Sequence, residues 1–135
     1  MKYPLLSIVT VICLSSPALV TAQPLNCGQP ASIFMTAGVS PLDLTQLAQS
    51  VGTAPLDGQS LRQVTQNLRA DYPKATDAEV SDVMITAFCT YLNTDAAPDL
   101  RNPANIRAFE KDTYDAVFGG PPPDSYQPQG WLYDK

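Results

Sequence analysis

The reactive side chains of this sequence are mainly carboxylates, because its 135 residues include 13 Asp and Glu but no histidine. Serine and cysteine hydrolases of the triad type need a histidine base, and zinc and haem sites lose their usual ligand without one. We therefore predict no metal site, no cofactor and no triad. The remaining enzymatic hypothesis is a hydrolase that uses carboxylates alone, for instance on glycans, and it requires two acidic groups that face each other.

Acidic residues gather at three places in the sequence. These places are Asp77, Glu79 and Asp82; Asp95 and Asp99; and Asp112 and Asp115. The first group falls in the first turns of an expected helix, where carboxylates stabilise the positive helix end. The second flanks an expected loop but lacks the glycine and final glutamate of an EF-hand. The third shares a helix with Arg107 and Lys111, which favours ordinary surface charge over catalysis.

Two cysteines, Cys27 and Cys89, lie outside the N-terminal apolar segment. In an oxidising compartment the simplest interpretation is a single disulfide between them. It closes a loop of about sixty residues, which corresponds to about 4 kcal/mol of stability in the loop-entropy model. The alternative is a pair of buried free thiols.

Residues 1–22 have the pattern of a secretory signal peptide. Lys2 supplies a positive charge, residues 5–14 form an apolar run too short to span a bilayer, and Val20-Thr21-Ala22 places small residues at a cleavage site after Ala22. A buried N-terminal helix or strand is the alternative. The sequence thus predicts an exported protein, either periplasmic or secreted, with Cys13 removed during processing.

The chain is acidic, with a formal net charge of −5. Its eight Lys and Arg residues are scattered singly, so no basic stripe is available for nucleic acid or for an anionic membrane surface. No segment after residue 22 is apolar over the length of a membrane span. We expect the partner to be another extracytoplasmic protein or a second copy of this chain.

Apolar spacing and end signals predict an all-α domain of four amphipathic helices over residues 40–52, 60–72, 77–93 and 103–118. The third helix has the strongest pattern, with a capping box from Thr76 to Glu79 and a broad apolar face that predicts a central position. Gly52 is interpreted as a stop signal of the first helix, and Ser60 with Gln63 as the capping box of the second. Asn102 followed by Pro103 opens the last helix, which Gly119 ends.

Residues 23–118 are therefore assigned to one helical domain with an irregular, disulfide-tethered N-terminus, and residues 119–135 to a Pro- and Gly-rich tail. A proline-rich segment is already extended and loses little entropy on binding. The tail also carries residues of the kind that anchor interfaces, namely Tyr126, Trp131, Leu132 and Tyr133. The alternative is that the tail folds back, with Trp131 covering an apolar patch on the helices.

Three functional hypotheses follow. The first is a non-catalytic protein-binding or inhibitory module, supported by export, small size, the missing catalytic groups and the aromatic tail. The second is a structural component of the cell envelope that associates with itself. The third is the carboxylate-only hydrolase, which has the weakest support.

Overall fold

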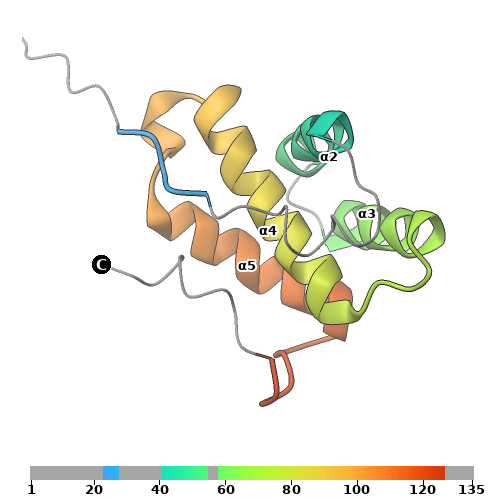
Figure 1. Ribbon diagram of the computed structural model, residues 1–135. Helices are drawn as coiled ribbons and strands as arrows, with labels where there is room; N and C mark the ends of the chain where they lie inside the picture. The colour runs from blue at the N-terminus through green and yellow to red at the C-terminus, as the bar shows by residue number, and fades with distance from the viewer. Residues whose placement is uncertain (1–22, 28–40, 55–57, 127–135) are drawn as a thin grey trace, which may run out of the picture.

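The computed structural model describes residues 23–27, 41–54 and 58–126, and these residues form four α-helices and one 3₁₀ turn (Figure 1). The elements are α2 (Pro41–Thr53), α3 (Gly58–Asp71), α4 (Asp77–Thr94), η1 (Pro98–Leu100) and α5 (Pro103–Phe118). The predicted all-α fold is confirmed, and each expected helix is found close to its expected bounds. The predicted signal peptide, residues 1–22, lies outside the described residues.

Helix α4 is the centre of the domain, as its broad apolar face predicts. It contacts α2 on one side and α5 on another, while α3 packs mainly against α5 (Figure 1). Its buried residues occupy most of its circumference: Val80, Ser81, Val83, Met84, Ile85, Thr86, Ala87, Phe88, Cys89 and Leu92. A helix that is apolar nearly all round is stable only when neighbours cover it, so α4 holds the other helices together.

Side-chain caps fix where α4 and α5 begin. The Thr76 hydroxyl accepts from the Glu79 backbone N–H, and the Glu79 carboxylate accepts from the Thr76 N–H in return at 2.7 Å. The Asn102 side chain accepts from the Asn105 N–H at 3.0 Å, with Pro103 in the first turn. Both predicted starts are confirmed. Each cap satisfies backbone donors that the helix itself leaves unpaired.

Two of the predicted helix boundaries are wrong, namely the start of the second helix and the stop signal of the first. Helix α3 begins at Gly58, so Ser60 lies inside the helix and does not cap it. Helix α2 runs past Gly52 to Thr53, and the positive φ angles of the described glycines occur at Gly119 and Gly120. Gly52 has a different role, because a Cβ built on it would lie 2.1 Å from Cγ of Tyr91 on α4. The missing side chain lets the Tyr91 ring lie directly on the α2 backbone.

Gly52→Ala is therefore expected to destabilise the protein by about 1–3 kcal/mol, because the Tyr91 ring must move out of its packed position. In an exposed helix the same change stabilises by about 1 kcal/mol, so the sign of the effect is informative. Urea denaturation measures it. In a Tyr91→Ala background the alanine at position 52 should be neutral or stabilising, and a stabilised single variant would contradict the close contact.

Two arginines donate hydrogen bonds to residues near the ends of the helices. Nη2 of Arg69 in α3 donates to the Asp77 carboxylate at 2.6 Å and to the Val117 carbonyl at 2.9 Å. It thereby joins the first turn of α4 to the last turn of α5. Nε of Arg101 donates to the Leu92 carbonyl at 2.8 Å near the other end of α4. The relative positions of α4 and α5 are thus fixed by polar contacts as well as by packing.

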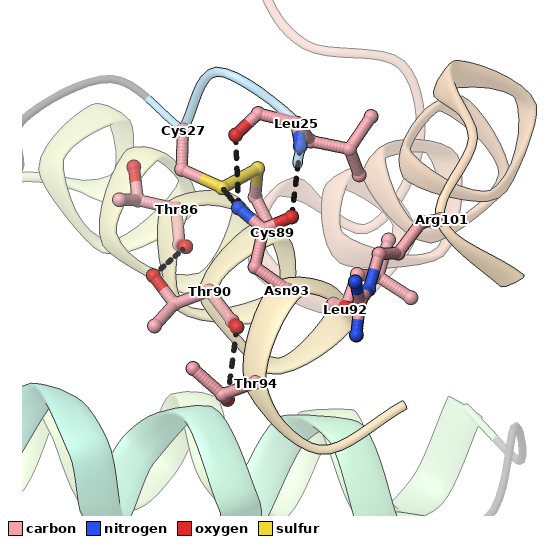
Figure 2. Close-up of a disulfide and its surroundings, with 9 residues drawn as sticks. All are labelled: Leu25, Cys27, Thr86, Cys89, Thr90, Leu92, Asn93, Thr94 and Arg101. Atoms are coloured by element: carbon pink, nitrogen blue, oxygen red, sulfur yellow. Dashed lines mark hydrogen bonds between the residues drawn. A yellow bond between two sulfur atoms is a disulfide. The ribbon is translucent and has the colours of Figure 1, made fainter. Parts of the chain in front are cut away.

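The predicted disulfide between Cys27 and Cys89 is present, with a Cα–Cα distance of 5.5 Å (Figure 2). The side chain of Asn93, one turn further along α4, holds the same segment. Its Oδ1 accepts from the Leu25 N–H, and its Nδ2 donates to the Leu25 carbonyl, both at 2.8 Å. Nδ2 also donates to Sγ of Cys27 at 3.2 Å, so the irregular segment 23–27 is held on α4 by the disulfide and three hydrogen bonds from Asn93.

None of the helices in the described part of the chain combines the length and the apolar character needed to cross a bilayer.

Candidate functional site

The most distinctive polar arrangement lies where the tail meets α4 and α5. We call it the Tyr126 cluster, and it consists of Asp82, Glu110, Tyr114, Phe118 and Tyr126. Asp82 comes from α4, and Tyr126 from the segment after α5. The other three residues are spaced by four along α5, so they lie on one face of that helix.

Local backbone geometry brings Tyr126 back to the helices. Gly119 ends α5 in the left-handed conformation, with φ of 76°, which glycine adopts without a steric penalty. Three prolines follow, and the Tyr126 N–H then donates to the Pro123 carbonyl at 2.8 Å, closing a turn. The chain therefore leaves α5 and turns (Figure 1), and the ring of Tyr126 contacts those of Tyr114 and Phe118 on the helix it has just left.

Tyr126 contacts the helices through both its ring and its hydroxyl. Its Oη donates to Oδ1 of Asp82 at 2.6 Å. Its ring meets that of Tyr114 edge-on, with centroids 5.5 Å apart, and that of Phe118 at 5.6 Å. Such aromatic contacts stabilise by about 0.5–1.5 kcal/mol each, and a hydrogen bond to a charged acceptor by about 1.5–3 kcal/mol. The cluster thus has the contacts needed to hold the base of the tail.

Glu110 is the buried carboxylate of the cluster, with only 4% of its surface exposed. The Tyr114 hydroxyl donates to its Oε1. Asp82 and Glu110 are each satisfied in this way by a tyrosine hydroxyl. A carboxylate that acts as a base or a nucleophile must reach its substrate, so this arrangement suits anchoring better than catalysis.

The environment of the cluster keeps both phenols neutral. Burial raises the pKa of Tyr114 far above its ordinary value, and the hydrogen bond to Glu110 raises it further. Burial, followed by the hydrogen bond to Asp82, also raises the pKa of Tyr126. A neutral phenol can donate a hydrogen bond and a phenolate cannot, so both contacts persist at neutral pH.

The raised pKa values predict a loss of stability in alkali. A folded-state pKa above the unfolded value of about 10 gives stability that is complete below pH ~10 and is lost as the pH rises through the folded-state pKa. In a spectrophotometric titration, Tyr114 and Tyr126 should ionise at higher pH in the folded protein than in urea. Tyr126→Phe should remove one late-titrating group. Identical titration curves in the folded and urea-unfolded protein would contradict the buried cluster.

A shallow groove of about 360 Å³ lies beside the cluster, between α5 and the proline segment. The α5 wall consists of Arg107, Glu110, Lys111, Tyr114 and Asp115. Pro121 and Pro122 close the other side, and carbon atoms make up most of the lining surface. The volume of the groove is at the low end of the range for small-ligand sites. It therefore suits one aromatic side chain better than an extended ligand.

The residues singled out by sequence lie in different places. Cys27 and Cys89 form the disulfide, and Tyr126 is half-buried on the helices. The other tail residues that we predicted to contact a partner lie outside the described residues: Trp131, Leu132 and Tyr133. Among the acidic groups, Asp77 pairs with Arg69 and Glu79 caps α4, whereas Asp82 belongs to the cluster.

Sequence reasoning missed Glu110 and Tyr114. Glu110 lies four residues after Ile106 and beside Phe109, so helical spacing places a carboxylate on the buried face of α5. Tyr114 follows at the spacing that allows a hydrogen bond. The sequence did contain a signal for this pair, because a charged residue on the apolar face of a helix is followed one turn later by a tyrosine.

In the described part of the chain, no group of three or more Cys, Asp or Glu side chains is arranged to hold a metal ion. Comparisons with protein-family models, curated proteins and solved structures found no match to this chain.

Proposed function

We propose that this chain is an exported, non-catalytic protein-binding module whose C-terminal tail contacts the partner. The observation that carries the proposal is the contact of Tyr126 with Asp82, Tyr114 and Phe118, which fixes the base of the tail to α4 and α5. The residues that follow, 127–135, include Trp131, Leu132 and Tyr133 and therefore start from a defined point on a rigid domain.

A fixed base favours binding for an entropic reason. Association must overcome the cost of ordering flexible chain, and anchoring one end of a segment reduces that cost before the partner arrives. Tryptophan and tyrosine are enriched among residues that dominate binding energy. The described surface offers no comparable apolar patch for a partner. Leu100, with 44% of its surface exposed, is the single large apolar residue exposed among the described residues.

Export is supported by the disulfide, because such bonds persist mainly in oxidising compartments outside the cytoplasm. If the leader assignment is correct, the protein recovered from the periplasm or medium should have a mass that begins at Gln23. An unprocessed chain that still begins at Met1 would contradict that assignment.

The tail is tested by capturing partners from the extracytoplasmic fraction of the native host with the full, oxidised protein. The test variant replaces Trp131, Leu132 and Tyr133 by alanine and leaves the Tyr126 cluster intact. The matched control is Leu100→Ala, which removes an exposed apolar side chain elsewhere. We expect a stoichiometric partner that the tail variant loses and the control keeps. Capture that all three proteins share equally would contradict a tail-mediated contact.

A further inference from the structure

The groove beside α5 suggests what happens to the tail when no partner is present. Its lining is mostly apolar, and the residues that form it are Arg107, Glu110, Lys111, Tyr114, Asp115, Pro121 and Pro122. Indole is the aromatic group that binds cations best, and its flat apolar body suits an aromatic and proline lining. We propose that, in the free protein, the side chain of Trp131 lies in this groove.

The anchored position of Tyr126 brings Trp131 within reach of the groove. The ring of Tyr126 lies with its centroid 5.5 Å from that of Tyr114, which is itself part of the groove wall. The turn from Pro123 to Tyr126 reverses the chain next to the groove. Extended chain from Tyr126 to Trp131 reaches up to about 17 Å, so the indole can reach any part of the groove.

Because only a few residues separate Trp131 from the anchored Tyr126, even a weak contact is sufficient to keep Trp131 in the groove. A segment held next to its site by a few residues has an effective concentration in the millimolar range. A contact with an intermolecular dissociation constant of only ~0.1 mM would then be closed about nine-tenths of the time. An intramolecular occupant therefore has the advantage over a dilute ligand of the same chemistry.

This contact would compete with any partner that binds the tail. It does not itself require a partner. A partner that binds Trp131 must first displace the side chain from the groove. The apparent affinity is then reduced in proportion to the fraction of molecules in which Trp131 is outside the groove. The inference concerns the isolated protein, so it stands or fails separately from the proposed function.

The chain's single tryptophan makes the test direct, since all indole fluorescence comes from Trp131. The experiment measures acrylamide quenching of the full, oxidised protein and of a synthetic peptide of residues 123–135. The test variant is Arg107→Ala with Lys111→Ala, two exposed groove residues. The matched control is Arg62→Ala with Lys74→Ala, two exposed cations that do not line the groove. Unchanged unfolding midpoints verify that both variants fold.

We expect the quenching constant of the wild-type protein to be about threefold below that of the peptide, as for an indole with most of its surface covered. The groove variant should approach the peptide value, and the control should match the wild type. Equal quenching of wild type and peptide would overturn the proposal. Protection that the groove variant retains in full would also overturn it, because Trp131 would then be buried elsewhere.

Discussion

Replacing Cys27 by serine should lower the free energy of unfolding by about 4 kcal/mol relative to the oxidised protein. The disulfide joins residues separated by 62 positions, so its loss frees a long loop in the unfolded chain. A small domain is stable by only about 5–15 kcal/mol, which makes this a large share of the total. Cys27 is the better position to change, because Cys89 is fully buried and its replacement would also alter the core.

Urea denaturation of the oxidised, reduced and Cys27→Ser proteins separates the disulfide from its surroundings. The reduced wild type should unfold at the same urea concentration as the serine variant. Asn93→Ala is the matched control, because it removes the hydrogen bonds to Leu25 and leaves the disulfide in place. It should cost about 1–2 kcal/mol. Equal stability of oxidised wild type and Cys27→Ser would contradict a structural role for the bond.

Phe109→Ala is the second change with a large expected effect, a loss of about 3–5 kcal/mol. Phe109 is 2% exposed, and its ring stacks on that of Phe88 with centroids 4.0 Å apart. The substitution leaves a cavity between α5 and the central helix, which the surrounding close-packed side chains fill only in part.

Chemical denaturation measures this loss, and two variants at related positions serve as controls. Phe109→Leu keeps most of the apolar volume and should cost less than half as much. Phe118→Ala, at a half-buried position of the same helix, should also cost less than Phe109→Ala. If Phe109→Ala cost no more than Phe118→Ala, the result would contradict the buried, stacked position of Phe109 between α4 and α5.

The helices were predictable because their signals are local. The capping box from Thr76 to Glu79 and the apolar spacing that follows depend only on residues within one helix. The disulfide was predictable because the chain offers one pair of cysteines outside the apolar N-terminal segment.

Features that depend on contacts between helices were not predictable. Gly52 reads locally as a helix end, yet its role is set by the Tyr91 ring on another helix. Asp82 reads as a first-turn charge, yet it accepts from Tyr126, which lies 44 positions away. The sequence left open whether the tail folds back, because that depends on a surface made by α4 and α5 together.

A tail that binds a partner from a fixed base requires Tyr126 to lie against α4 and α5. The most direct test is proton NMR of the full, oxidised protein, with Tyr126→Phe used to assign the ring. We predict nuclear Overhauser contacts from the Tyr126 ring to the rings of Tyr114 and Phe118, together with ring-current shifts that disappear in Tyr126→Ala. A Tyr126 ring with contacts to its sequence neighbours alone, at the shifts of an unstructured peptide, would contradict the anchored tail.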